Sequence, residues 1–398
     1  MSPSLLQLHA RGIQDSYLTQ EPQINVFKYN YYRYVNFATD SVEINLNNAA
    51  VFGQKSTCVL PMKGHLLSKL YLHLKLPALV PTSGTYACWS DTLGYAIFRD
   101  AIELQVGGIT VDRLYPHFLY AWDELSNATK RNGRDLMLLK SDVYVSSKTN
   151  AEKEIDLVIP LEFWFTKQYN MALPILSMAN QEIRINFNLR KFSECINYDG
   201  PTPPEPVDII SSSIFGEYIF LDESIYKQLR DQKHTFLIDQ VQYNGAEIIQ
   251  PNATSYSTLL KFNNPCKEIL FFCVETENIN NNNYFNFSKN GADALVSRAS
   301  LYLNGRPRFD NLPEFYYRLI FPDCVHVRVP TTHIYCMPFC LRPEDNQPTG
   351  SINMTKFDDV TLGLTLAPNN GECQLFTYAI NYNLVTIEKG FLKLEFVY

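Results

Sequence analysis

The sequence predicts an all-β protein made of two tandem antiparallel jelly-roll β-barrels joined by a short helix. Apolar and polar residues alternate through many short segments, turn residues separate these segments, and no long helical pattern interrupts them. Four segments of the first half also recur in order in the second half. Alternation alone does not separate a jelly roll from other β-sandwiches, but a jelly roll suits a domain of this size that must hide its sheet edges.

Composition and charge limit the classes of function. The chain has 398 residues, of which 46% are hydrophobic and 19% charged, as is typical of a globular protein with more than one domain. Its 25 Tyr and 25 Phe favour strands and supply aromatic surface for subunit contacts. The net charge of −7, without any run of Lys or Arg, argues against direct binding of nucleic acid. The start of the chain lacks the pattern of a secretory signal, so we expect a protein made and assembled in the cytoplasm.

Nine cysteines are scattered along the chain without a CxxC pair, which favours reduced thiols. One set of residues could be imagined as a zinc site, namely Cys324, His333, Cys336 and Cys340. This set lacks the paired spacing of zinc motifs, and the large apolar residues between its cysteines indicate a strand with alternating faces. We therefore predict no metal and no cofactor.

The first jelly roll is expected over residues 25–222, after an N-terminal arm of residues 1–24 that carries a small apolar cluster and turn residues. Its strand-like segments are 25–46, 70–76, 102–106, 159–165 and 182–190. Two short helices are expected, at Pro116–Leu125 and Arg134–Leu139. The proline-rich run 201–206 cannot lie in a central strand and is interpreted as a loop before the last strand of this roll.

A strand, a short helix and a second strand are predicted in Tyr218–Gly245, where the two rolls meet. Asp222 is a good N-cap, and Ile225 and Leu229 lie one turn apart on one helix face. We therefore expect a linker helix at residues 223–233 and the second jelly roll at residues 234–398.

The internal repeat appears when Gly108 is aligned with Gly305. The strand-to-turn unit IELQVGG then corresponds to ASLYLNG, and IPLEFWF corresponds to IYCMPFCL. The alternating segments 183–189 and 360–366 form a third pair, and the aromatic-led strands at Tyr218 and Tyr378 form a fourth. The spacings drift as loops would, so the repeat predicts two similar β-domains.

Blocks along nearly the whole chain are similar to one known family. They include the opening run with Gln14, Asp15, Pro22, Arg33 and Asn36; a block with Gly107, Gly108 and Trp122; PLEFWF with Trp164; YIFLD with Asp222, followed by Gln240; LNG with Asn304 and Gly305; PEDNQPTGS with Gln347 and Pro348; and YAINYN with Asn381. In this order they resemble the double jelly-roll major capsid proteins of nucleocytoplasmic large DNA viruses, such as chlorella viruses, iridoviruses and mimiviruses. The signature residues are candidates for structural or interface roles.

The resemblance implies a homotrimer with a pseudo-hexagonal outline that tiles an icosahedral shell over an internal membrane. Its expected partners are further copies of itself, neighbouring capsomers and minor capsid proteins, with the N-terminal arm in contact with the inner membrane layer. The expected location is the virion capsid.

Three other functions are alternatives to this one. A minor capsid or scaffolding paralogue would have the same double barrel, and a lectin-like attachment protein would usually carry a secretory signal. A jelly-roll enzyme such as a cupin would need an HxH pair, and the seven histidines offer none. Because GxSxG and P-loop motifs are also missing, we predict that the protein is not an enzyme.

Overall fold

The computed structural model describes residues 2–24, 26–27, 31–126, 131–140 and 153–396. The chain forms two compact units, Met1–Phe37 and Ala38–Tyr398. The first unit contains the short helices α1 (Pro3–His9), η1 (Ile13–Asp15) and α2 (Ser16–Thr19), none of which buries a residue. No helix among the described residues is both long enough and apolar enough to cross a membrane.

The second unit begins with a pair of four-stranded sheets, which we call the first roll. One sheet has the order β1-β10-β3-β7 and the other β2-β8-β5-β6. The strands are β1 (Phe37–Asn45), β2 (Lys55–Val59), β3 (Leu66–Leu76), β5 (Ile102–Val106), β6 (Ile109–Leu114), β7 (Ile155–Pro160), β8 (Ile183–Asn188) and β10 (Ser211–Leu221), with β4 (Ala87–Trp89) paired to β9 (Ile196–Tyr198). Its helices are α3 (Leu93–Ala96), α4 (Pro116–Ser126), α5 (Arg131–Met137), η2 (Trp164–Thr166), η3 (Tyr169–Met171), η4 (Ile175–Met178) and η5 (Phe192–Glu194).

Helix α7 (Glu223–Asp231) follows β10 and leads into the second roll. One sheet of the second roll has the order β11-β21-β13-β18, which we call the shared sheet, and the other has the order β12-β20-β16-β17. The strands are β11 (His234–Ile249), β12 (Ser255–Leu259), β13 (Pro265–Glu275), β16 (Val296–Leu303), β17 (Arg306–Pro313), β18 (Tyr335–Pro338), β20 (Val360–Leu366) and β21 (Cys373–Glu388). Smaller elements are α8 (Thr276–Asn280), β14 (Ser288–Lys289), β15 (Asp293–Ala294), η6 (Tyr316–Ile320), α9 (Phe321–Val325), β19 (Ile352–Asn353), η7 (Met354–Lys356) and β22 (Phe391–Leu394).

The two rolls have the same topology. In each roll the chain passes back and forth between the two sheets, and of the strands in these orders only one consecutive pair, β5 and β6 or β16 and β17, lies in the same sheet. Equivalent strands occupy the same places in the two strand orders. Thus β5, β7, β8 and β10 correspond to β16, β18, β20 and β21, in the order of the four pairs that the internal repeat predicted. The strand expected over 159–165 is wrong after Pro160, because β7 ends there and the chain turns into helix η2 at Trp164. This alternation between two packed antiparallel sheets is a jelly roll, so the predicted fold is confirmed.

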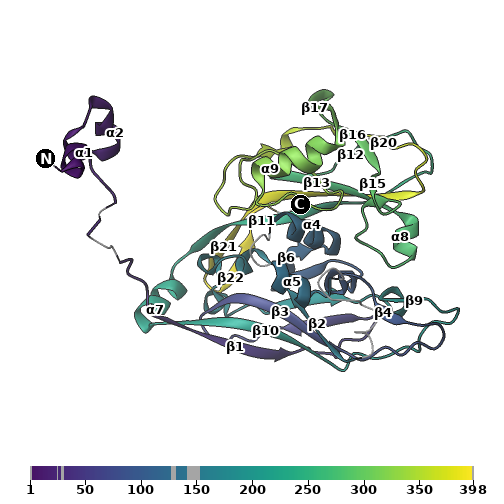
Figure 1. The fold of residues 1–398 in the computed structure, drawn as a ribbon. Coiled ribbons are helices and arrows are strands. Elements are labelled where there is room, and N and C mark those ends of the chain that lie inside the picture. The colour runs from purple at the N-terminus through teal and green to yellow at the C-terminus, as the bar shows by residue number, and fades with distance from the viewer. Residues whose placement is uncertain (1, 25, 28–30, 127–130, 141–152, 397–398) are drawn as a thin grey trace. The chain divides into compact units, whose positions relative to one another are not determined.

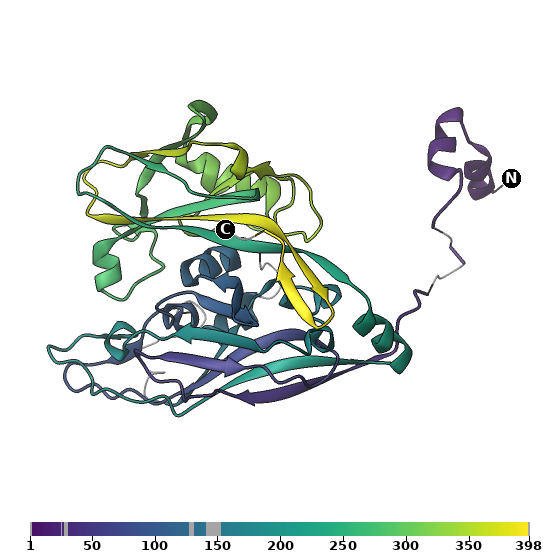
Figure 2. The ribbon, with the colours of Figure 1, turned by 180° about the vertical axis from the view of Figure 1, so that it is seen from behind.

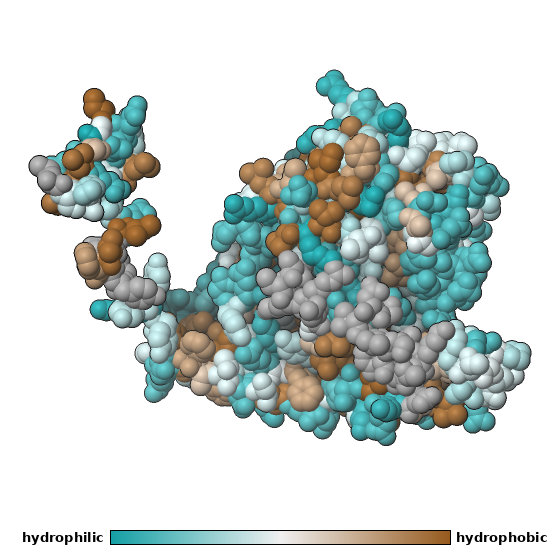
Figure 3. All heavy atoms as spheres, viewed as in Figure 1, coloured by the Kyte–Doolittle hydropathy of each residue, from teal (hydrophilic) through white to brown (hydrophobic). Residues whose placement is uncertain are grey.

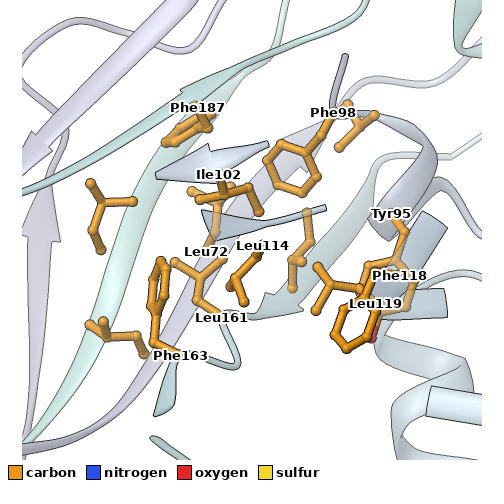
Figure 4. Close-up of a cluster of buried hydrophobic side chains, with 14 of the residues drawn as sticks. Leu72, Tyr95, Phe98, Ile102, Leu114, Phe118, Leu119, Leu161, Phe163 and Phe187 are labelled. Atoms are coloured by element: carbon orange, nitrogen blue, oxygen red, sulfur yellow. The ribbon is translucent and has the colours of Figure 1, made fainter. Parts of the chain in front are cut away.

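The two rolls are stacked, with helix α4 between them in both views (Figures 1 and 2). The first roll is filled by side chains from both of its sheets, such as Leu72, Ile102 and Phe187, and from α4, such as Phe118 (Figure 4). These side chains are almost fully buried. They come from the alternating positions that predicted the strands, because only one face of each strand points inward.

Most predicted elements lie where the sequence placed them. Helices α4 and α5 lie at the two expected positions, and Asp222 is the N-cap residue of α7, whose Ile225 and Leu229 are half-buried. The strand expected over 25–46 is shorter. Residues 25 and 28–30 lie outside the described residues, and the other residues before Phe37 form no strand. The side chains of residues 31–36 are exposed, and alternation produces a strand only where one face is covered or paired.

Tight hairpin turns connect the equivalent strand pairs. Asn304 and Gly305 join β16 to β17 with φ values of 49° and 72°, and Gly107 and Gly108 join β5 to β6 with φ values of 59° and 85°. Two consecutive residues with positive φ are typical of the type I′ turn, whose twist matches that of the strands. The side-chain oxygen of Asn304 also accepts hydrogen bonds from the backbone N–H groups of Asp358 and Asp359, each at 3.0 Å. Asn304 therefore ties this turn to the start of β20.

Replacing Asn304 with Ala tests this interpretation. The Asn304→Ala change should lower the free energy of unfolding in urea by about 1–3 kcal/mol, because it removes both hydrogen bonds and places alanine at a positive φ. Asn369→Ala is the matched control, since Asn369 has a φ of 55° and its side chain takes part in no hydrogen bond among the described residues. Equal losses for the two variants would show that the hydrogen bonds of Asn304 contribute nothing.

Candidate functional site at the junction of the two rolls

The shared sheet is buried on both of its faces. Along β13, Leu270 and Phe272 face the core that includes the first roll, whereas Ile269 and Phe271 face the core of the second roll. Strand β21 alternates in the same way, with Tyr378 on the side of the first roll. A strand buried on both faces has no polar side, which explains the nearly continuous apolar run of β13. The two rolls are thus joined through one sheet.

Aromatic rings from α4 and its flank fill the space beside the shared sheet. His117 stacks on Phe376 with ring centres 4.4 Å apart, and Phe118 packs on Tyr378 at 5.8 Å. All described side chains of α4 from Phe118 to Leu125 are buried. Burial lowers the pKa of His117 to about 3, so this imidazole is neutral at physiological pH. The junction is therefore a desolvated aromatic layer.

Asp239 lies between one lysine from each roll. Its carboxylate oxygens are 3.1 Å from Nζ of Lys167 in the first roll and 3.1 Å from Nζ of Lys267 in β13. The side chain of Lys267 is fully buried, and its Nζ also donates to the backbone oxygen of Asp345 at 3.1 Å. Burial alone would raise the pKa of Asp239, but the two ammonium groups hold it below its ordinary value. The Lys167–Asp239 ion pair therefore joins the two rolls, while Lys267 neutralises the same carboxylate from within the second roll.

A second polar cluster is centred on Glu124 of α4. Lys140 of the first roll approaches one carboxylate oxygen to 2.6 Å. From the second roll, the hydroxyl of Thr331 donates to the other oxygen at 3.0 Å, and the guanidinium of Arg328 lies 3.6 Å from it. Glu124 is almost completely buried, so its charge requires these partners.

Hydrogen bonds of amide side chains cross the same junction. The Nε2 of Gln240 on β11 donates to the backbone oxygen of Val111 on β6 at 2.6 Å, and Asn383 donates to the Oε1 of Gln240 at 2.7 Å. At the edge, Asn282 donates to the backbone oxygens of Ser193 and Ile196 at 2.9 and 2.8 Å. The asparagine-rich segment 278–283 thus contacts the first roll.

Asp112 is a buried carboxyl group at the edge of this region. Its Oδ1 accepts a hydrogen bond from the backbone N–H of Arg113 at 2.8 Å. Burial raises the pKa of Asp112 to about 7, although the nearby Lys167 acts in the opposite direction. The carboxyl group therefore changes its charge near neutral pH.

The family-signature residues lie in four different places. Trp122, Trp164 and Gln240 are buried at the junction, where Lys167 lies over the ring of Trp122. Asn381 is buried in β21, and Asn304, Gly305 and Asp222 belong to a turn and a helix cap. Gln347 and Pro348 are exposed on the loop after β18, and Gln14, Pro22, Arg33 and Asn36 are exposed in the first unit. Asp15, also in the first unit, accepts a hydrogen bond from the backbone N–H of Gly12 at 2.7 Å.

Sequence reasoning missed Asp239, and it placed Glu124 and Lys267 only in blocks that resemble the family, without their role at the centre of the junction. A signal for one of them was present, because Lys267 and Glu268 interrupt an otherwise apolar strand, PCKEILFFCV. A charged residue in such a run indicates a buried partner. The pattern could not identify that partner, since it lies on another strand.

Comparisons with known proteins agree with this architecture. A family model described as the N-terminus of a major capsid protein matches residues 25–222. A second model, of the large eukaryotic DNA virus major capsid protein, matches residues 227–392. The chain belongs to the family of double jelly-roll major capsid proteins of large DNA viruses.

Curated relatives and solved structures cover almost the whole chain. The major capsid protein of Pyramimonas orientalis virus is 28% identical over 417 residues, and the match covers 98% of this chain and 98% of the relative. That of Paramecium bursaria Chlorella virus 1 is 28% identical over 394 residues, covering 92% of this chain and 87% of the relative. The fold matches the capsid model of the latter virus with a TM-score of 0.79 at 23% identity, over 94% of this chain and all of the other. The Faustovirus major capsid protein matches with a TM-score of 0.75 at 12% identity, over 97% of this chain and 96% of the other.

Membership of this family indicates a function in the virus particle. The comparisons support the function of a major capsid protein of a large DNA virus, a structural component of the virion rather than an enzyme. In a major capsid protein, the junction has a mechanical role. It fixes the two rolls to each other within the chain.

Replacing Asp239 with Asn tests whether the charges at the junction hold the rolls together. The Asp239→Asn change leaves the buried ammonium group of Lys267 and the partly buried one of Lys167 without their carboxylate, so the free energy of unfolding should fall by about 3–5 kcal/mol. Asp231→Asn is the control, because Asp231 forms an exposed ion pair with Arg230 and its loss should leave stability unchanged within error. Equal stability of Asp239→Asn and the parent chain would contradict the assigned role.

Asp112 predicts a specific pH dependence. The folded chain keeps the proton of Asp112 up to about pH 7, whereas the unfolded chain releases it near the ordinary pKa of 3.8. The contribution of this group to stability is therefore full below pH 3.8 and is lost as the pH rises to 7. Asp112→Asn removes the titration, so its stability relative to the parent should increase by up to about 4 kcal/mol between pH 4 and pH 8. Urea unfolding at both pH values measures this change, and a pH-independent difference would refute it.

Proposed function

We propose that the protein forms a homotrimeric capsomer with a pseudo-hexagonal outline, which tiles the icosahedral shell of a large DNA virus over an internal membrane. The observation that carries this proposal is the duplication of one jelly-roll topology within a single chain. Three copies of two equivalent barrels supply six similar units, and closed rotational symmetry is the usual form of a homo-oligomer. The proposed parts are the arm at 1–24, the rolls at 25–222 and 234–398, and the linker helix at 223–233.

An exposed apolar patch on the second roll supports contact between copies. Hydrophobic residues gather on the face that carries α9 in Figure 3. The patch consists of Phe315, Leu319, Ile320, Val327 and Leu341, whose side chains are 38–74% exposed. Contiguous exposed apolar surface of this kind marks interaction sites, and a stable contact should bury at least about 1,000 Å² in total. We assign the patch to the interface between protomers.

The N-terminal arm is the proposed contact with the inside of the shell. Its apolar side chains Leu5, Leu6, Leu8, Ile13 and Leu18 are exposed, and its short helices bury none of their own residues. Such helices gain stability mainly from a partner surface. We propose that the arm contacts minor capsid proteins or the inner membrane layer. The net charge of −7 fits a shell protein, assembled in the host cytoplasm, that does not bind the genome directly.

The mass of the purified protein in solution tests the capsomer. Light scattering after size-exclusion chromatography should give three times the chain mass of 45.8 kDa, stable from low to high salt because the contact is largely apolar. Ile320→Asp should shift the mass towards the monomer by placing a charge in the patch. Ile109→Asp, which charges an exposed apolar residue on β6 of the first roll, should leave the trimer intact.

A monomer at every concentration would refute the self-sufficient capsomer and favour a minor capsid or scaffolding paralogue that assembles with another chain. A trimer that survives Ile320→Asp would refute only the assignment of the patch. Counting copies per virion by quantitative mass spectrometry then separates a principal shell protein from a paralogue, because a shell protein dominates the particle.

A further inference from the structure

Three potential metal ligands converge on the face of the shared sheet that points toward the first roll. Glu268 lies on β13, Cys336 lies on β18, and His326 is the residue that ends α9. One ligand atom from each residue lies within 4.8 Å of the other two, and all three side chains are buried. This set shares only Cys336 with the four residues that the sequence suggested. Of the others, Cys324 is exposed on α9.

The strand register explains why two of these residues meet. Leu270 is directly opposite Cys336 in the antiparallel pair, and Glu268 is two residues before Leu270 on β13. Residues two apart on a strand share a face, so Glu268 and Cys336 both point toward the first roll. The ring of Trp122 in α4 packs edge-on against His326 with centres 5.8 Å apart, which closes the cluster from that side.

The imidazole of His326 is held in one orientation. Its Nε2 faces both carboxylate oxygens of Glu268, at 2.9 and 3.1 Å, on the side where Cys336 lies. Its Nδ1 faces Oε1 of Glu344 at 3.0 Å, and the backbone N–H of Val327 donates to the same oxygen at 2.9 Å. A carboxylate that binds the outer nitrogen of a histidine is the usual support for a metal-binding imidazole, because it fixes the tautomer and the ring.

We propose that Glu268, His326 and Cys336 bind one Zn²⁺ ion, with Glu344 orienting His326. A thiolate, an imidazole and a carboxylate are the three ligand types that zinc takes in proteins, at about 2.3, 2.0 and 2.1 Å from the ion. Ligand atoms around such an ion are up to about 4 Å apart, so a small contraction of the cluster is enough. A bidentate Glu268 would make the site four-coordinate but distorted, because the two oxygens of one carboxylate are too close together for two corners of a tetrahedron.

Zinc at this place would cross-link three elements that are distant in sequence, namely β13, β18 and the end of α9. No disulfide could cross-link these elements, because none of the nine cysteines, all of which lie in the described part of the chain, is bridged to another. Binding requires loss of the Cys336 proton and a neutral His326, with the Nδ1 proton directed at Glu344. The site is buried, so zinc would enter during folding and leave only on unfolding.

A proton is the competing occupant of the same cluster. Burial by itself would lower the pKa of His326, but Glu268 and Glu344 outweigh burial and raise this pKa well above its ordinary value. In that case a protonated imidazole would bridge two carboxylates, and Cys336 would stay a neutral thiol. The metal content of the folded chain distinguishes the two occupants.

The test uses the full-length protein, produced with zinc in the medium and dialysed against a chelator. Elemental analysis should give about one zinc per chain, and a colorimetric chelator should detect this zinc only after unfolding in guanidinium chloride. Cys336→Ser should retain less than a tenth of the zinc. Cys195→Ser, which alters a buried thiol of the first roll, is the matched control and should retain all of it.

A measurement on the unmodified chain covers the case in which Cys336→Ser does not fold. Protein refolded with Co²⁺ should show the near-ultraviolet absorption of a cobalt–thiolate bond, and protein refolded with Zn²⁺ should have a Tm at least about 5 °C above that of protein refolded without metal. Zinc below a tenth of an equivalent together with no cobalt–thiolate band would overturn the proposal in favour of the proton. Full zinc content in a folded Cys336→Ser would overturn it as well.

Discussion

The structure depends on one constraint, which is that a single sheet serves two hydrophobic cores. The shared sheet packs its odd and even positions against different rolls, so neither roll has a solvated face on that side. Separating the rolls would expose Leu270, Phe272 and Tyr378 together with the aromatic side chains of α4. Each fully buried side chain of this kind is worth about 1.5–3 kcal/mol, so the rolls behave as one block rather than as two beads on a linker.

Charged groups at the junction make that packing specific. Moving Asp239, Lys267 or Glu124 out of water is costly unless each meets its partner with good geometry. The Lys167–Asp239 ion pair and the Thr331–Glu124 hydrogen bond each join one roll to the other, so these contacts form only in one relative arrangement of the rolls. Under the proposed function such a fixed arrangement is needed, because small angular errors would add up across the many copies of a shell.

Much of the fold could be predicted because its rules are local. The Gly107–Gly108 and Asn304–Gly305 turns, the alternation along β8 and β20, and the N-cap Asp222 each follow from a few adjacent residues. The junction could not be predicted in this way, since Asp239, Lys167 and Lys267 lie on three different segments. Resemblance to a family singled out Trp122 and Gln240, and only the structure showed that both face the other roll.

Hydrogen exchange along β13 tests most directly whether the two rolls form one rigid block. If the account is right, the backbone amides of residues 266–274 exchange only through global unfolding, with the same free energy as the most protected amides of β3 in the first roll. Protection of both strands should also fall together as urea is added. Exchange of β13 at a distinctly lower free energy than β3 would show that the rolls separate in the native state, which contradicts the account.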